Sequence, residues 1–222
     1  MISVVVICHN YGRFLSKCVQ SILLNKKKYI REILIINDSS IDNTEEVSKK
    51  LKKNNKLVKY FKCNFSSLSK STNFGVRKSK SAWLTKIDAD DFVSKNFLKD
   101  YFDELKKKQL DFIYGDIIQI NELEKKEKII KQNYNKKNIF KYPMGSGTIF
   151  SKKLWSSVGG FNEKLFYQDD FDFWLKIKKE IKFSKGYINK ANYFYKKHKK
   201  NMSKNYLKKN LTKIYLLLKY LI

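Results

Sequence analysis

Three aspartates crowd into one short segment of the chain. Asp88, Asp90 and Asp91 stand in "LTKIDADDFV", directly after a short apolar run. Crowded carboxylates raise one another's pKa unless a cation lies between them. Oxygen ligands two residues apart in a tight turn suit Mg²⁺ or Mn²⁺, which keeps waters and shares phosphate oxygens. The segment therefore predicts metal-assisted phosphate chemistry, although a solvated acidic turn that caps the next helix would use the same residues.

The chain is strongly basic, and its charge depends on lysine. The 222 residues carry a formal net charge of +27, and the only arginines are Arg13, Arg31 and Arg77. Nucleic-acid readers depend on arginine for bidentate contacts, so this composition argues against nucleic acid as a partner. Because so large a charge attracts polyanions in general, we expect an anionic membrane surface or an acidic glycan as the neighbour.

The cysteines and the apolar segments indicate the cellular setting. The three cysteines at 8, 18 and 63 have no C-x-x-C spacing, which favours reduced thiols in the cytoplasm. The apolar start lacks a basic leader and predicts a strand instead of a signal peptide. No segment reaches the roughly 18 uninterrupted apolar residues of a membrane-spanning helix. The tail "LTKIYLLLKYLI" predicts a helix that packs on the core, docks on a partner or a second copy, or lies on a membrane surface.

Apolar runs and helical spacing alternate through the first half of the chain. Strands are predicted at 2–8, 32–37, 57–61, 82–87 and 110–117. Amphipathic helices are predicted at 14–23, 40–53, 67–79 and 97–105, with Asp42 as N-cap of the second helix and Glu45 three residues later. This alternation predicts an α/β fold with right-handed βαβ units, a mainly parallel central sheet and helices on both faces.

The second half is less regular. A lysine-rich stretch at 124–137 predicts a solvated hairpin or loop, and 145–155 predicts a loop that enters a strand and a short helix. A helix is predicted at 169–180, a strand at 191–195 and a C-terminal helix at 201–222. No linker divides the chain, so a single domain is expected.

Polar clusters at 9–11, 37–44 and 88–91 follow three of the predicted strands. In an open α/β sheet, ligands bind outside the carboxyl ends of the strands, so the three clusters are expected on one rim. A Rossmann dinucleotide site would need a glycine-rich turn after the first strand, and this turn has only Gly12. The phosphates of a bound nucleotide must therefore be neutralised in another way, which a metal on the aspartates would supply.

Six segments, in this order, resemble the family 2 glycosyltransferases over essentially the whole chain. They are "VVVICHNYGRFLSKCVQSIL", "EILIINDSSIDNT", "NFGVRKSKSAWLTKIDADD", "GSGTIFSKKLWSSVGGFNEKL", "YQDDFDFWLKI" and "YFYKKHKKNMS". The resemblance implies the GT-A fold, a nucleotide-sugar donor and transfer with inversion. It also implies a nucleotide-binding half at 1–115, an acceptor and catalytic half at 116–200, and a terminal helix at 201–222.

The resemblance implies a donor site on the predicted rim. His9 and Tyr11 would line the base pocket, and Asp38 would accept the uracil imide N–H, which favours UDP. Asp88 would approach the ribose. For Asp38, a role in a turn or a helix cap is the alternative.

The resemblance also implies a metal, Mn²⁺ or Mg²⁺, that bridges the diphosphate. Asp90 would bind it, and His198 would be a further ligand, although a lone histidine is often structural. One departure affects the diphosphate: the family often has an arginine before the asparagine that matches Asn73, and this chain has Thr72. Lys70 or Arg77 would have to supply the missing charge.

An acidic pair at the start of the 169–180 helix matches the segment that carries the family's catalytic base. The resemblance implies Asp170 as base and Asp169 as a supporting group, with helix capping by both as the alternative. Trp174, one turn later, would be an acceptor wall or a buried aromatic. The loop Gly145, Ser146 and Gly147 matches the loop near the donor sugar and acceptor, where an ordinary turn is the alternative.

The resemblance predicts a hexosyltransferase-type enzyme that moves a sugar from a UDP-sugar to an acceptor hydroxyl. The expected setting is the assembly of surface polysaccharide, lipopolysaccharide or glycolipid at the cytoplasmic face of the membrane, with a glycan or a lipid-linked acceptor. Three alternatives stay open: a haloacid-dehalogenase-like phosphatase, a nucleotidyltransferase, and a basic module that binds polyanions or membrane surfaces. Metal chelation distinguishes the basic binding module from the glycosyltransferase, because binding to a polyanion should survive EDTA and binding of the donor should not.

Overall fold

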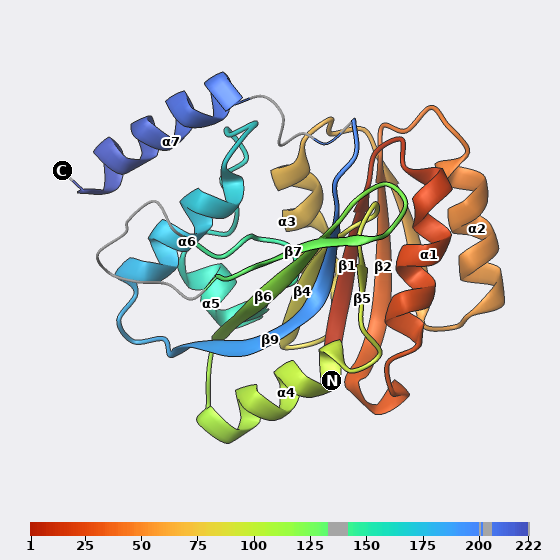
Figure 1. The fold of residues 1–222 in the computed structure, drawn as a ribbon, viewed down its shortest axis with the longest axis horizontal. Helices are drawn as coiled ribbons and strands as arrows, with labels where there is room; N and C mark the ends of the chain where they lie inside the picture. Colours follow the sequence, from red (N-terminus) through yellow and green to blue (C-terminus); the bar gives the residue numbers. More distant parts are fainter. Residues whose placement is uncertain (133–141, 200, 202–205, 222) are drawn as a thin grey trace.

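The computed structural model describes residues 1–132, 142–199, 201 and 206–221. A curled central sheet carries helices on both faces (Figure 1). The strands are β1 (Ile2–Cys8), β2 (Ile30–Asp38), β3 (Val58–Cys63), β4 (Trp83–Asp88), β5 (Phe92–Val93), β6 (Phe112–Ile120), β7 (Lys126–Ile130), β8 (Ile149–Ser151) and β9 (Lys185–Lys196). The helices are α1 (Gly12–Leu23), the 3₁₀ helix η1 (Lys27–Tyr29), α2 (Thr44–Asn54), α3 (Leu68–Lys78), α4 (Phe97–Lys108), α5 (Lys152–Ser157), α6 (Asp169–Lys179) and α7 (Tyr206–Leu221).

The first four long strands form a parallel sheet in the order β3-β2-β1-β4. All of β1 is buried, which agrees with its mainly β-branched sequence without polar alternation. The α/β fold predicted from the sequence is therefore confirmed. The second half departs from the parallel pattern, because the three-residue β8 runs antiparallel between β4 and β6. β9 then pairs in parallel with β6 and antiparallel with β5, which completes a mixed sheet.

The sheet separates two hydrophobic cores. Val4 and Val6 of β1 face a core that includes side chains of α1 and α4. Val5 and Ile7 face the opposite core, where α3, α5, α6 and α7 contribute. This alternation follows from the two-residue period of a strand, and it fixes the sheet firmly between two helical layers.

Two local predictions need correction. Asp42 is not the N-cap of α2, which begins at Thr44 after Asn43. The Asp42 carboxylate instead accepts hydrogen bonds from the backbone N–H groups of Thr44 and Gly12, both at 3.0 Å. Asp42 therefore joins the starts of α1 and α2, and Glu45 pairs with lysines rather than completing a capping box.

The lysine-rich stretch forms a hairpin where it is described. β7 pairs antiparallel with β6, and residues 133–137 of the predicted stretch lie outside the described residues. The C-terminal helix is present as α7, while 202–205 and 222 of its predicted range are outside the described residues.

Candidate active site

The structure brings the three polar clusters to one rim of the sheet, as predicted. Ile7 of β1 is in register with Asp88 of β4, and the next residue of β1, Cys8, is in register with Asn37 of β2. His9 lies with its Nδ1 at 2.6 Å from the backbone oxygen of Asp38. The ends of β1, β2 and β4 therefore form one continuous polar edge.

Asp38 is buried at this edge and is fully engaged by the protein. Its Oδ1 accepts bonds from the Ser39 hydroxyl and from two backbone N–H groups at 65–66, at 2.7–2.9 Å. Its Oδ2 accepts from the backbone N–H of Ser67 and the hydroxyl of Ser71 at 2.9 and 2.7 Å. Burial raises the pKa of Asp38, but these donors outweigh burial and lower it. Asp38 thus anchors the loop before α3, and a uracil N–H would have to displace one of these donors.

The aspartates of "DADD" have separate partners. Asp88 Oδ2 accepts a 2.6 Å bond from the Ser146 hydroxyl, and its Oδ1 lies 3.3 Å from Lys86 Nζ. Asp91 accepts bonds from the Tyr193 hydroxyl and the Lys196 backbone N–H, at 2.5 and 2.8 Å, and so fixes β9 to the rim. Burial and then its two acidic neighbours raise the pKa of Asp91.

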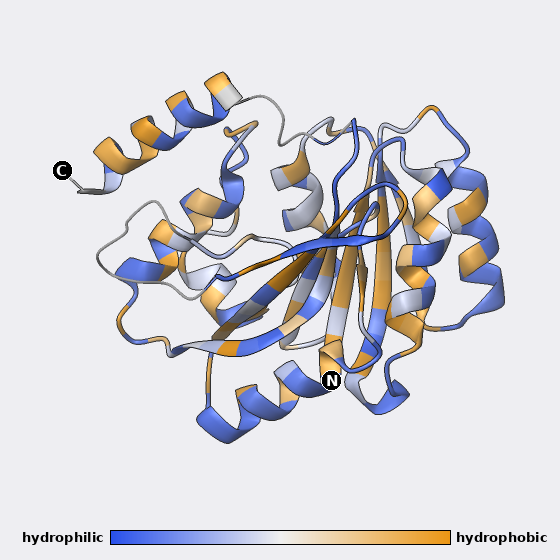
Figure 2. Ribbon diagram, viewed as in Figure 1, coloured by the Kyte–Doolittle hydropathy of each residue, from blue (hydrophilic) through white to orange (hydrophobic). Residues whose placement is uncertain are grey.

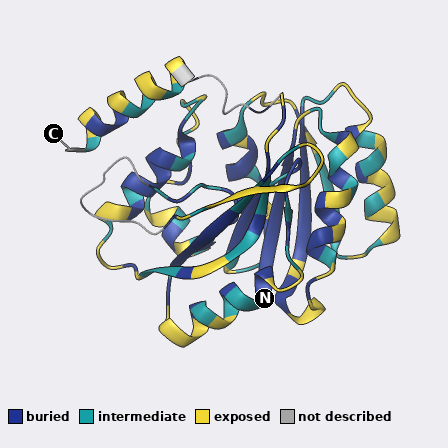
Figure 3. Cartoon of the chain, viewed as in Figure 1, coloured by how far each residue is buried: buried dark blue, intermediate teal, exposed yellow. Residues whose placement is uncertain are grey.

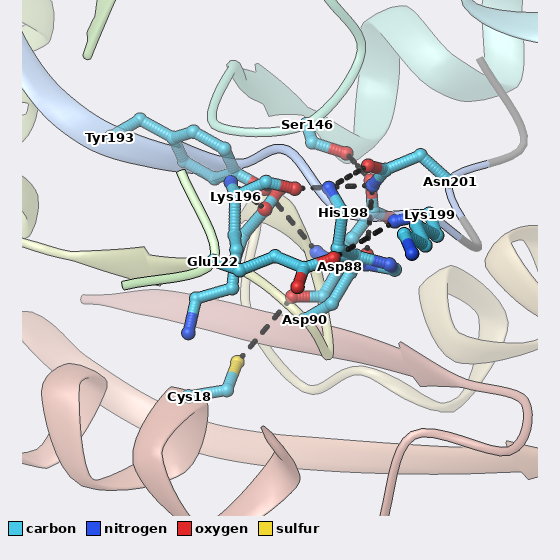
Figure 4. Close-up of polar contacts among 11 residues, drawn as sticks. Cys18, Asp88, Asp90, Glu122, Ser146, Tyr193, Lys196, His198, Lys199 and Asn201 are labelled. Carbon is cyan, nitrogen blue, oxygen red and sulfur yellow. Dashed lines mark hydrogen bonds and ion pairs between the residues drawn. The ribbon is translucent and has the colours of Figure 1, made fainter. Parts of the chain in front are cut away.

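Asp90 and His198 meet although they are far apart in sequence. His198 Nε2 lies 2.8 Å from Asp90 Oδ2, and Asn201 Nδ2 approaches the same oxygen at 3.4 Å. Figure 4 shows both side chains turned toward Asp90. The His198 ring lies against those of Tyr11 and Phe14, with centroids 5.6 and 5.5 Å apart. The structure therefore also places Tyr11 at this corner of the rim.

A carboxylate and an imidazole are ligands that Mn²⁺ accepts, so Asp90 and His198 fit such an ion. Among the described residues there is no group of three or more His, Cys, Asp or Glu that could hold a metal. An ion bound here would therefore take its other ligands from water and from a diphosphate, as Mg²⁺ and Mn²⁺ commonly do.

The two candidates for the diphosphate cation lie at opposite ends of α3. Lys70 is exposed in the first turn, next to the Ser67 hydroxyl that caps the helix, and Asp38 lies beside that turn. Arg77 is in the last turn, with Nη1 3.7 Å from Glu163. This placement favours Lys70 over Arg77 as the group near a bound diphosphate.

The acidic pair begins α6 and contacts the glycine loop. Asp170 Oδ1 accepts a 2.8 Å bond from the Phe171 N–H, and its Oδ2 lies 3.4 Å from the Gly145 N–H. A Cβ at Gly145 would lie 2.7 Å from the Asp170 Cβ, so only glycine lets the loop lie this close. Ser146 meanwhile binds Asp88, and Gly147 has φ +78°. The loop therefore connects Asp88 on the rim to the acidic pair.

Asp169 is more deeply placed than Asp170. Its Oδ2 is buried and has no hydrogen-bond partner among the described residues. Burial raises the pKa of Asp169 to about 6, while the ammonium of Lys86 opposes the rise. Sequence reasoning missed Lys86, whose only signal was a lysine inside the apolar run "WLTKI".

Trp174 is not an acceptor wall. It is 5% exposed, and its ring packs against Phe112 and Tyr114 of β6 with centroids 5.7 and 5.8 Å away. Helix α6 is buried along most of its length, so the side one turn after Asp170 faces the core. The alternative that Trp174 is a buried aromatic is correct.

Comparisons with known proteins agree on one family. The family model described as "Glycosyl transferase family 2" matches residues 3–168. A chondroitin synthase of Pasteurella multocida is 28% identical over 200 residues, covering 87% of this chain and 20% of that protein. Glycosyltransferase GlyA of Streptococcus pneumoniae is 25% identical, covering 94% of this chain and 32% of that protein. This chain therefore spans between a fifth and a third of the length of these relatives.

The fold is also similar to that of a solved structure. S. aureus TarS 1-349 in complex with UDP-GlcNAc superimposes with a TM-score of 0.77 and 20% identity. The match covers 93% of this chain and 61% of that one. At this identity the likeness establishes the fold alone.

Proposed function

The chain belongs to glycosyl transferase family 2, and on this basis we propose that it transfers a sugar from a UDP-sugar to an acceptor hydroxyl with inversion. The observation that carries the proposal is the loop at 145–147, which contacts Asp88 at the rim and Asp170 on α6. One loop thus lies between a donor side and a candidate base. The UDP-GlcNAc bound in the TarS structure supports a nucleotide sugar as donor. The similarity to a chondroitin synthase and a hyaluronan synthase of Pasteurella multocida supports a polysaccharide product.

Each step of this reaction has a candidate group. Asp170 takes the proton of the acceptor hydroxyl, whose oxygen forms a bond to the anomeric carbon. The bond from that carbon to the diphosphate breaks on the opposite face, and UDP leaves with the electron pair. A divalent ion on Asp90 and His198 supplies neutralisation of the diphosphate charge when bound. Because the chain belongs to this family, we discard the phosphatase and nucleotidyltransferase alternatives.

A thermal-shift panel of UDP, GDP, CDP and ADP, each with Mn²⁺ and with EDTA, tests the donor proposal. We expect UDP to raise the melting temperature with Mn²⁺ and to have no effect with EDTA, because a ligand that binds only the native state stabilises it. A larger shift from another nucleotide would remove the uracil assignment of Asp38. The proposal fails if no nucleotide raises the melting temperature, or if the shift is the same with EDTA as with Mn²⁺.

We also propose that α7 lies on the anionic inner face of a membrane, where a lipid-linked acceptor would be presented. Helix α7 carries hydrophobic residues and exposed residues along its length (Figures 2 and 3). Four large apolar residues that share one side by their helical spacing are exposed: Leu207 (73%), Leu211 (59%), Ile214 (53%) and Leu218 (56%). The helix has four lysines at 208, 209, 213 and 219 and no acidic residue. None of the helices in the described ranges is both long and apolar enough to cross a bilayer. An exposed apolar stripe flanked by lysines favours lying in an anionic interface.

Vesicle sedimentation tests this placement. We expect Leu211→Ser/Leu218→Ser to bind vesicles containing anionic lipid at least ~10-fold more weakly than wild type, because burial of each leucine contributes ~1.5–3 kcal/mol. Ile181→Ser is the matched control, since Ile181 is 94% exposed outside α7. If wild type binds neutral vesicles as tightly as anionic ones, the lysines of α7 do not contribute to membrane binding. If the double variant instead dissociates an oligomer, a second copy of the chain covers α7.

A further inference from the structure

Lys86 is a buried charge at the centre of the candidate site. Lys86 is only 4% exposed, although it lies near the carboxyl end of β4, beside the rim. Its ammonium is 3.3 Å from Asp88 Oδ1, and its backbone oxygen accepts a 2.9 Å bond from the Gly147 N–H. A lysine is rarely buried unless it is paired, so the surroundings of this ammonium need an explanation.

Carboxylates from two elements interact with Lys86, and the 145–147 loop connects these elements. Gly147 donates to the backbone oxygen of Lys86, and Gly145 lies against Asp170. Asp88 belongs to β4, and Asp169 and Asp170 belong to α6. Burial lowers the pKa of Lys86, but the attraction of Asp88, Asp169 and Asp170 is stronger and holds the pKa above its ordinary value. Lys86 is therefore charged, and it is the cation between the crowded acidic groups.

Asp169 depends most on this cation. It is 6% exposed, and its Oδ2 has no hydrogen-bond partner among the described residues. Burial raises its pKa to about 6, Lys86 opposes that rise, and Asp170 and Asp88 add to it.

Two further groups face the acidic pair. Tyr142, which donates a 2.6 Å hydrogen bond to Gln168, interacts with both carboxylates. Lys213 of α7 interacts with Asp170 and lies over the Tyr142 ring at 4.8 Å. Burial, the largest influence, lowers the pKa of Lys213. Of the two lysines, Lys86 is the one that influences Asp169 directly.

We propose that Lys86 is a positioning residue, the resident counter-ion that keeps the acidic pair of α6 ionised and ties it to Asp88 on the donor side. The catalytic meaning of this role rests on the proposed function. An acidic pair with two negative charges attracts the acceptor's proton more strongly than a pair that already holds a proton. Lys86 thereby extends the active, doubly ionised form toward lower pH.

Direct titration of Asp169 tests the proposal without any substrate. In protein labelled with ¹³C at the aspartate carboxyls, the resonance absent from Asp169→Asn reports this group. We expect its midpoint, about 6 in the wild type, to rise by at least about one pH unit in Lys86→Met, because the opposing charge is gone. Lys86→Arg should retain the wild-type midpoint. An unchanged midpoint in Lys86→Met would overturn the proposal.

Lys196→Met is the matched control. Lys196 is equally buried, at 5% exposed, but its ammonium lies 2.6 Å from Glu124. Its loss should leave the Asp169 midpoint unchanged. If Lys86→Met does not fold, Lys86→Gln provides the same comparison, because the amide keeps hydrogen bonding and removes the charge.

The pH profile of UDP release supplies the second readout, with the donor identified by thermal shift. In Lys86→Met the acid limb of kcat/KM should move upward with the Asp169 midpoint, whereas a purely structural role would lower kcat/KM equally at every pH. A shifted Asp169 midpoint with an unshifted acid limb would leave the counter-ion role intact and overturn the catalytic role of the pair. The two proposals are thus distinguishable.

Discussion

Asp170→Asn is expected to lower the rate of sugar transfer by ~10²–10⁴-fold, the usual contribution of a positioned general base. Asparagine has nearly the same shape as aspartate, and its Oδ1 can keep the contact with the N–H of Phe171 or Gly145. It cannot take a proton from the acceptor hydroxyl. UDP release from the donor, with and without acceptor, measures the loss.

Donor binding is the control for this variant. The UDP-dependent thermal shift should be the same in Asp170→Asn and in wild type, because the 145–147 loop separates Asp170 from Asp88, where the proposed donor site lies. Asp169→Asn is the matched comparison and should lose less activity. If Asp169→Asn is the more severely impaired of the two, Asp169 is the base and the assignment within the pair is wrong.

The first half of the fold could be predicted because its signals are local. β1 and β2 each contain a mainly apolar run of strand length, and the polar segments that follow them must meet at one rim once the strands are parallel. The order of the later strands has no such signal. β8 has only three residues, Ile149–Ser151, and its place between β4 and β6 depends on tertiary pairing.

The side-chain roles were less predictable, because burial and partners decide them. Asp42 was predicted as the N-cap of a helix and Asp38 as the acceptor of a uracil N–H, with a turn or cap as the alternative. In the structure Asp42 accepts from the backbone N–H of Gly12, and Asp38 accepts from the backbone of the loop before α3. Trp174 lay at the right spacing from Asp170, but most of α6 is buried and that side faces β6. Lys86 had a signal, since a lysine inside a buried strand run needs a partner. One partner, Asp88, lies in the same strand, but the other two come from a helix more than eighty residues away.

The 145–147 loop connects the rim to the acidic pair through a small set of contacts. Ser146 connects to Asp88, Gly145 to Asp170, and Gly147 to the backbone of Lys86. A small loop with these three contacts responds to a change at either side. Variants of Lys86 and variants of Asp169 and Asp170 should therefore be compared in the same assays.

Asp90→Asn is expected to weaken Mn²⁺-dependent UDP binding by at least ~100-fold, more than the loss of an outer-shell partner causes, because a metal ligand is removed. At a UDP concentration ~100 times Kd, wild type gains ~2.7 kcal/mol, and a ~100-fold weaker variant gains ~0.4 kcal/mol. For a chain of this size the UDP shift should fall from about 5–11 °C to about 1–2 °C. Without ligand, the variant should melt no lower than wild type. Burial and the neighbouring Asp88 raise the pKa of Asp90, although His198 opposes the rise. The charged carboxylate is therefore costly to bury, and a neutral amide is easier to bury.

Asp91→Asn should show the reverse pattern and so separates metal binding from folding. Asp91 accepts bonds from Tyr193 and Lys196 with its two oxygens, so its change should lower the melting temperature of the free protein by disturbing β9. Its UDP shift with Mn²⁺ should persist. If Asp90→Asn instead keeps a full UDP shift that EDTA abolishes, the ion is held elsewhere on the rim, and the 2.8 Å contact of Asp90 with His198 is a structural bond that positions the segment after β9.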